Sequence, residues 1–269
     1  MSNQSGFPFS FATLDNQPFQ VVATPDRSRA VLCLHGLGGG PYEMRPLAPL
    51  LLNLGWTVEA IAYPGHDQPG PKMPNSRWED WYQAVETAFD RLAQSHAQVV
   101  VIGFSTGCPL ALRLALQRSI GGLVLLSPFM AIVRPAAWLP SAEQLLPWVY
   151  PLLKEVPRSA LAIADPEGRA AADRVAPYRS FHLGAVQSAL ALIQQVRPRL
   201  GEITVPTLIV QPKRDRVVNP QGALYLFESL GSSSKRLCWL EKSDHILTLD
   251  YDREQAFQEI ATFFNQFPA

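Results

Sequence analysis

The serine between two glycines is the first residue of this chain whose surroundings could support chemistry. Ser105 lies in "GFSTG" (103–107), after the apolar run "VVVI" and before the helix-forming segment "CPLALRLA". Glycines on both sides relieve crowding around a residue that is forced into an unfavourable backbone conformation. A strand-to-helix turn of this kind can hold a serine nucleophile above a sheet. A tight turn without chemistry is the alternative, and we favour the nucleophile.

A serine hydroxyl needs a base to take its proton, and the chain offers five histidines. His245, in "SDHIL", follows the last apolar run and is expected at the same sheet edge as Ser105, so we predict it as the base. The other four have weaker claims: His35 shapes a turn, His66 is a minor catalytic candidate in a loop, His96 lies at the opposite end of the sheet, and His182 is a satisfied polar residue.

The base needs an acid that fixes its tautomer and supports the imidazolium. Asp215, in "QPKRDRVV", follows the penultimate apolar run by a short loop and is the predicted acid. Asp244 is a rival, but neighbouring side chains seldom face each other well enough for this pairing. Asp250 and Asp252 are expected to cap the last helix, where carboxylates complement the helix dipole.

The anionic oxygen of an acyl-transfer intermediate needs backbone N–H donors. The amide of Thr106 is one candidate, because it lies at the start of a helix. "HGLGGG" (35–40) supplies the other, since Gly36 allows a sharp turn that aims the amide of Leu37 into the site. A phosphate-binding loop is the alternative, but the Gly-x-Gly-x-x-Gly spacing is missing.

The segments that must position these residues alternate between strand and helix patterns. Such alternation predicts βαβ units and a mostly parallel, doubly wound α/β sheet. The predicted strands are 30–36, 56–65, 98–104, 121–128, 206–212 and 235–241. The predicted helices are 43–54, 77–95, 106–118, 221–230 and 253–265. The opening segment 9–24 is expected to add an antiparallel edge hairpin.

The alternation stops between residues 130 and 200, which contain helix signals, many prolines and no convincing strand. A capping-box pattern at Ser141–Gln144 indicates a helix start. We predict a core of residues 1–129 and 201–269, and a helical cap insertion of residues 130–200. An ordinary helical extension that packs on a sheet face is the alternative.

Composition excludes several classes of function. The 23 basic and 23 acidic residues balance, which argues against a nucleic-acid partner. We find no signal-peptide pattern and no apolar stretch long enough to span a bilayer. Three cysteines (Cys33, Cys108 and Cys238) lack metal-ligand spacing and are predicted to be buried free thiols in a reducing cytoplasm. We therefore expect a cytoplasmic globular protein without a metal or an organic cofactor, and the sequence leaves its oligomeric state open.

Together, the motifs resemble the α/β-hydrolase superfamily, and more closely its bacterial carboxylesterase and monoacylglycerol-lipase branch. The resemblance covers nearly the whole chain and rests on "LCLHGLGGGPYEM", "YPGHD", "GFSTG", "PKRDRVVNP" and "SDHILTLDYDREQ". The chain order serine, aspartate, histidine is the order of that superfamily. Asp67 and Thr106 depart from the usual residues of the branch, and both flank the rim of the expected site.

The resemblance implies an ester hydrolase with Ser105, Asp215 and His245 as the triad and Leu37 and Thr106 as oxyanion donors. The apolar residues of the insert add the expectation that it acts on short- to medium-chain acyl esters. Some apolar residues of the insert and the preceding strand exit are expected to face the substrate: Phe129, Met130, Trp138, Leu145, Leu146, Trp148, Tyr150 and Leu153. A thioesterase or acyltransferase is the nearest alternative, followed by a peptidase, a carbon–carbon hydrolase and a non-catalytic ligand-binding homologue.

Overall fold

The computed structural model describes residues 9–23, 28–67, 70–133, 140, 142–158 and 160–267. Its strands are β1 Phe19–Val21, β2 Arg29–Leu34, β3 Thr57–Ala60, β4 Gln98–Phe104, β5 Gly122–Leu126, β6 Glu155–Pro157, β7 Ser180–His182, β8 Thr207–Pro212 and β9 Lys235–Leu240. Its α-helices are α1 Ala48–Asn53, α2 Trp78–Ser95, α3 Gly107–Ala115, α4 Ala142–Val149, α5 Pro166–Val175, α6 Leu183–Val196, α7 Gln221–Ser229 and α8 Arg253–Phe264.

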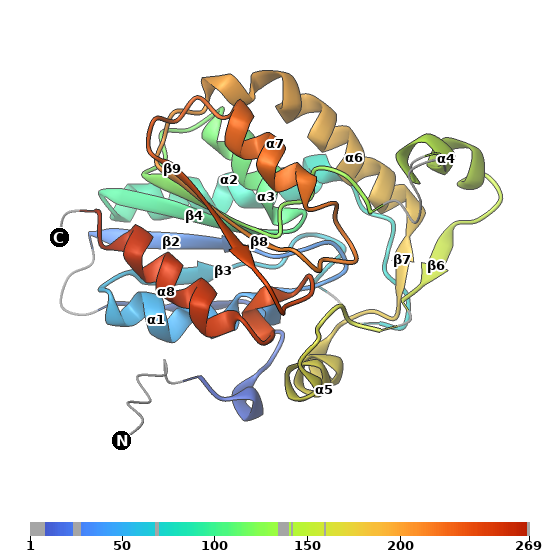
Figure 1. Ribbon diagram of the computed structural model, residues 1–269, viewed down its shortest axis with the longest axis horizontal. Coiled ribbons are helices and arrows are strands. Elements are labelled where there is room, and N and C mark those ends of the chain that lie inside the picture. Colours follow the sequence, from blue (N-terminus) through green and yellow to red (C-terminus); the bar gives the residue numbers. More distant parts are fainter. Residues whose placement is uncertain are drawn as a thin grey trace.

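Seven strands form one sheet in the order β1-β3-β2-β4-β5-β8-β9 (Figure 1). Only β1 is antiparallel to its neighbour, so the predicted mostly parallel, doubly wound sheet is confirmed. The register sets Leu34 of β2 beside Gly103 of β4, and Phe104 beside Leu126 of β5. Because parallel strands end at one edge, the loops that carry the predicted site residues all leave the sheet together.

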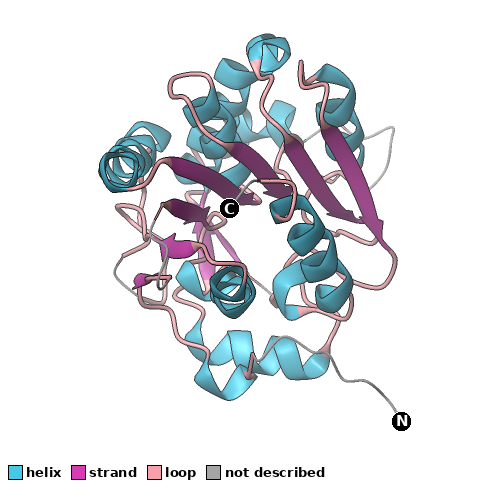
Figure 2. Ribbon diagram, turned by 90° about the vertical axis from the view of Figure 1, so that its left-hand side faces the viewer, coloured by secondary structure: helices cyan, strands magenta, loops and turns pink. Residues whose placement is uncertain are grey.

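Helices cover both faces of the twisted sheet (Figures 1 and 2). Alternate residues of β2 face opposite layers: Leu32 packs in the cluster that includes α2, α3, α6 and α7, and Cys33 packs in the cluster of α1 and α8. The continuous apolar runs of the sequence are explained by this two-sided burial. Cys33, Cys108 and Cys238 are free and buried, as predicted.

Between β5 and β8, the chain builds α4, β6, α5, β7 and α6. The first four elements lie beyond the carboxyl ends of the parallel strands (Figure 1), and α6 packs against α2 and α3 of the core. β6 and β7 pair with each other in an antiparallel two-stranded sheet. The sequence missed both strands because each has only three residues, too few to show an alternating pattern. The division into a core and a cap at residues 130 and 200 stays a prediction.

Two further sequence predictions differ from the structure. The opening segment supplies the predicted antiparallel edge strand, β1, but no hairpin, since Phe11–Thr13 forms a 3-10 turn. The predicted helix over 43–54 is replaced by the 3-10 turns Pro41–Glu43 and Arg45–Leu47, followed by α1. Proline is tolerated only in the first turn of a helix, so Pro49 would break an α-helix that began at residue 43 and fits one that begins at Ala48. The capping residue Ser141 lies outside the described residues.

Candidate active site

The predicted nucleophile occupies a strained turn between β4 and α3. Ser105 has φ 51°, in the left-handed region that a residue with a side chain seldom adopts. Its N–H donates to the carbonyl of Leu126, at 2.9 Å, which anchors the turn to β5. The flanking glycines are explained by close packing. A Cβ at Gly103 would lie 2.5 Å from the carbonyl oxygen of Gly107, and one at Gly107 would lie 2.2 Å from that of Leu34.

The structure brings the three predicted triad residues together in one line. His245 Nε2 is 2.9 Å from Ser105 Oγ, and His245 Nδ1 is 2.7 Å from Asp215 Oδ2. Asp215 Oδ1 accepts the backbone N–H groups of Val217 and Val218, both at 2.9 Å, which orients the carboxylate. The three side chains come from the loops after β4, β8 and β9, and all three are buried.

Asp244 does not pair with the imidazole of His245. Its carboxylate binds the guanidinium of Arg216, with Oδ2 2.6 Å from Nε, and its Oδ1 accepts the backbone N–H of Arg216 and of His245. Asp244 therefore ties the loop of Asp215 to the loop of His245. The preference for Asp215 over Asp244 as the partner of His245 agrees with this geometry.

Asp252 lies at the entry to the last helix, as expected, but neither carboxylate caps that helix with a hydrogen bond. Asp250 is fully buried and accepts four backbone N–H groups, at Ala164, Asp165, Asp244 and Tyr251. Asp252 stands at the N-cap position of α8, but its carboxylate accepts the N–H groups of Lys242 and Ser243. Both carboxylates therefore supply acceptors for backbone donors of the loop that carries His245, and Asp250 also ties this loop to Ala164 and Asp165.

Ser127, at the end of β5, was missed by the sequence predictions. It has φ 45°, and its Oγ donates to the carbonyl of His245 at 2.7 Å. Its N–H donates to Val210 of β8, at 2.9 Å, so the residue links β5, β8 and the loop of His245. A polar residue directly after a buried strand, at the edge where the site was expected, was the available signal.

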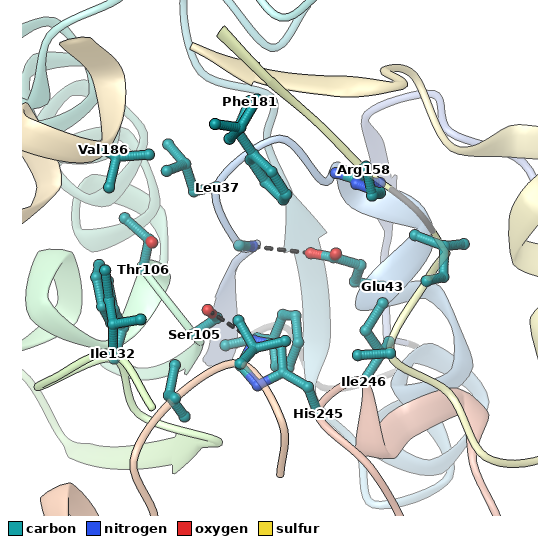
Figure 3. Close-up of a pocket in the computed structure, with 18 of the residues that line it drawn as sticks. Leu37, Glu43, Ser105, Thr106, Ile132, Arg158, Phe181, Val186, His245 and Ile246 are labelled. Carbon is teal, nitrogen blue, oxygen red and sulfur yellow. Dashed lines mark hydrogen bonds between the residues drawn. The ribbon is translucent and has the colours of Figure 1, made fainter. Parts of the chain in front are cut away.

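The glycine-rich loop after β2 turns sharply next to Ser105. The N–H of Gly39 donates to the carbonyl of Gly36 at 3.2 Å, and Gly38 has φ 63°. Leu37 and Thr106, the predicted oxyanion donors, both line the cavity that contains Ser105 and His245 (Figure 3).

The electrostatic surroundings of His245 favour its protonation. Burial alone would lower its pKa, but the negative charge and hydrogen bond of Asp215 outweigh burial, and Glu43 and Asp244 add to the effect. The net result is a pKa above the ordinary histidine value of 6.5. A base of this kind can take a proton from a serine and keep it while the imidazolium lies against a carboxylate.

The other four histidines lie outside this arrangement. His35 is buried and contacts the Gly36 carbonyl through Nδ1 at 2.9 Å, as expected for a residue that shapes the turn. His66 is buried among aromatic rings and does not line the cavity, so it is not a catalytic candidate. His96 follows α2 at the far end of the sheet, and His182 accepts the N–H of Gly184 at the start of α6.

A cavity of about 350 Å³ opens above Ser105 and is lined mainly by apolar side chains. Ile132, Val156, Phe181 and Val186 contribute to its walls, so the missed strands β6 and β7 and the start of α6 shape it (Figure 3). The predicted facing of apolar residues toward the cavity is confirmed for Phe129 and Leu146. Of the other candidates, Met130 is buried in the core, and Leu145, Trp148, Tyr150 and Leu153 lie outside the lining. Trp138 lies outside the described residues.

The described part of the chain shows neither a metal-binding cluster nor a helix that could cross a membrane. No group of three or more His, Cys, Asp or Glu side chains there could hold a metal ion. Each helix in those same ranges is too short or too polar to span a lipid bilayer.

Residues 25–252 match the Hydrolase_4 family, described as "Serine aminopeptidase, S33". The chain belongs to this family. As a member of Hydrolase_4, it is an α/β hydrolase, in agreement with the mostly parallel sheet and with the resemblance of its motifs.

Curated relatives place this Hydrolase_4 member in the carboxylesterase and monoacylglycerol-lipase branch. A Bacillus subtilis carboxylesterase is 25% identical over 239 residues, which cover 88% of this chain and 93% of the relative. A thermostable monoacylglycerol lipase from Bacillus sp. (strain H-257) is 29% identical over 235 residues, 87% and 89% of the two chains. The predicted branch is confirmed, and these relatives support an ester hydrolase.

Solved structures show the same fold. A structure reported with the metagenome-derived lipolytic enzymes LipS and LipT has a TM-score of 0.80 at 23% identity, and covers 94% of this chain and 98% of that one. The monoacylglycerol lipase of Paleococcus ferrophilus has a TM-score of 0.76 at 21% identity, with 93% and 99% covered.

Proposed function

We propose that the protein is a serine carboxylic-ester hydrolase that acts on short- to medium-chain acyl esters through an acyl-enzyme intermediate. The continuous hydrogen-bonded line from Asp215 through His245 to Ser105, at the floor of an apolar cavity, carries this proposal. The names of the relatives, carboxylesterase and monoacylglycerol lipase, point to the same chemistry.

In the proposed reaction, His245 Nε2 accepts the proton of Ser105 Oγ as the oxygen attacks the ester carbonyl. The carbonyl oxygen becomes an anion and accepts hydrogen bonds from the amides of Leu37 and Thr106. His245 then donates the proton to the departing alcohol, and the acyl group remains on Ser105. A water molecule repeats the sequence, which releases the acid and restores the serine. Asp215 keeps the imidazole in the required tautomer throughout.

The apolar walls of the cavity favour substrates with an acyl chain. Each buried methylene contributes about 0.8 kcal/mol, which is roughly a fourfold gain in kcat/KM per carbon. We expect kcat/KM to rise from acetyl esters to chains of about six to twelve carbons and then to level off as the cavity fills. Monoacylglycerols should be accepted, and bulky triacylglycerols poorly. A flat profile, or one that is highest at acetyl, would contradict the acyl pocket.

The alternatives differ in the bond that is cleaved or in whether any bond is cleaved. The family description names an aminopeptidase, and the same serine could also act on thioesters or pass the acyl group to another alcohol. A panel of matched ester, thioester and peptide substrates with one acyl chain, together with a fluorophosphonate probe, separates these outcomes. We expect esters to be the best substrates and the probe to label Ser105. If the probe labels no residue, the protein is a non-catalytic homologue.

A further inference from the structure

Glu43 is a buried carboxylate inside the candidate site for which the triad mechanism gives no role. It belongs to the 3-10 turn Pro41–Glu43, only 4% of its surface is exposed, and it lines the same cavity as Ser105 (Figure 3). A carboxylate in such a place costs stability unless it is paired or hydrogen-bonded. Its partners therefore indicate what the residue does.

The side chain of Glu43 is bound to the first turn of the glycine-rich loop. Its Oε2 accepts the backbone N–H of Gly36 at 2.8 Å, and its Oε1 accepts the hydroxyl of Tyr42 at 3.3 Å. Gly36 is closely packed, because a Cβ there would lie 3.2 Å from the Cβ of Ser105 and 3.3 Å from Oε2 of Glu43. The peptide that follows Gly36 carries the amide of Leu37. The bond to Glu43 holds the peptide before Gly36. The carbonyl of Gly36, which shares a peptide with the Leu37 amide, lies 2.9 Å from His35 Nδ1. Together these two contacts hold the turn from which the predicted oxyanion donor projects.

The backbone of Glu43 is tied to the loop of the base. Its carbonyl accepts the hydroxyl of Thr248 at 2.7 Å, and Thr248 follows His245 by three residues. One residue therefore contacts the loop of the predicted oxyanion donor through its side chain and the loop of the predicted base through its backbone.

We propose that Glu43 is a positioning residue for acyl transfer, which anchors the glycine-rich loop at Gly36 through its carboxylate and the loop of His245 through its carbonyl, and lines the same cavity as the base. This inference rests on the proposed function. It adds that the oxyanion site depends on a side chain seven residues after Gly36, and that the charge of this side chain acts on the base.

The titratable and charged groups around Glu43 are Tyr42 on its own turn, Arg158 after β6, Tyr63 in the loop after β3, and His245. Burial is the main influence and raises the pKa of Glu43 to about 7, against the Gly36 hydrogen bond and the charge of Arg158. In its charged form Glu43 raises the pKa of His245, together with Asp215 and Asp244. The loss of this charge should move the acid limb of the pH profile to lower pH.

Two substitutions separate the hydrogen bond from the charge. Glu43→Gln keeps an oxygen that can accept the Gly36 N–H, and the Tyr42 hydroxyl can accept from the new amide, but the charge is lost. We expect kcat on a p-nitrophenyl ester to stay near the wild-type value above the acid limb, which moves to lower pH. Glu43→Asp keeps the charge but withdraws it by one methylene from Gly36. We expect kcat to fall by about ten- to a hundredfold with little change in KM, and the acid limb to stay in place.

Tyr42→Phe is the matched control, since it removes the second hydrogen bond of Glu43 and leaves the bond to Gly36. It should keep the wild-type kcat and acid limb, and thermal melting of each variant checks that the fold is retained. A Glu43→Asp protein with wild-type kcat, or a Glu43→Gln protein with an unmoved acid limb, would overturn the inference. If the wild type hydrolyses no ester, or if the Ser105→Ala variant is still active, the proposed function itself is wrong, and this inference fails with it.

Discussion

His35 should lower the free energy of unfolding on acidification at pH values well above those at which most carboxylates titrate. Its imidazole is buried, stacks on Tyr63 with ring centroids 4.0 Å apart, and has Nδ1 2.9 Å from the carbonyl of Gly36. Burial lowers the pKa of His35 from 6.5 to about 4, against the effect of that hydrogen bond. In the unfolded chain the imidazole gains its proton near the ordinary value, so between these two pKa values only the unfolded state binds the proton.

The sign follows from this difference. As the pH falls below 6.5, the unfolded state is stabilised and the free energy of unfolding decreases, until the pH passes the folded pKa of about 4. Between about pH 7.5 and about pH 5, a shift from 6.5 to about 4 removes about 2 kcal/mol of stability. His66, whose pKa is also lowered by burial and by the nearby His35, adds to the loss.

The assay is urea unfolding of the wild type and of His35→Asn at the two pH values. Asparagine can donate a hydrogen bond to the carbonyl of Gly36 and does not titrate. The loss of stacking on Tyr63 lowers the stability of the variant, but by the same amount at both pH values. The drop in unfolding free energy on acidification should be about 2 kcal/mol smaller in His35→Asn than in the wild type. Equal drops, within about 0.5 kcal/mol, would refute the argument that a buried neutral imidazole controls acid stability.

Three further predictions concern the site. Asp215→Asn should reduce kcat by about 10⁴, because the imidazole then adopts the wrong tautomer. Asp244→Asn should reduce kcat only about tenfold, since its partner, the guanidinium of Arg216, is exposed to water. Steady-state kinetics of the two variants check this order, and the reverse order would contradict it. Ser127→Ala should lower kcat by about five- to a hundredfold with the fold intact, because it leaves the buried carbonyl of His245 without its hydrogen-bond donor. A variant with the kcat of the wild type would show that Ser127 has no positioning role. The kcat/KM profile should rise with pH through the pKa of His245 and have its acid limb above 6.5, because the reaction needs the neutral imidazole; a limb below 6.5 would mean that burial outweighs Asp215.

The sequence predicted those features that depend on local patterns. The parallel strands appear as continuous apolar runs because both sheet faces are covered, and the positions of Ser105, Asp215 and His245 follow from the strand ends at which they lie. The turn at Ser105 was foreseeable because two glycines are needed where α3 approaches β2 and β4 so closely.

Features that depend on contacts between distant segments could not be predicted in the same way. Asp250 appears in the sequence as part of a helix start, yet it binds Ala164 and Asp165, more than eighty residues earlier. Ser127 and Glu43 act on His245 and Gly36 through single hydrogen bonds that no spacing reveals. The strands β6 and β7 are so short that only their mutual pairing defines them.

The most direct test of the account is the covalent labelling of Ser105. Intact-mass and peptide mass spectrometry after treatment with a fluorophosphonate should show one adduct per chain, located on Ser105, with loss of esterase activity in proportion to labelling. Ser105→Ala should remain unlabelled, fold normally, and lose several orders of magnitude in kcat, because the triad residues act as a unit. An adduct on another residue, or an active Ser105→Ala protein, would contradict the assignment of Ser105 as the nucleophile.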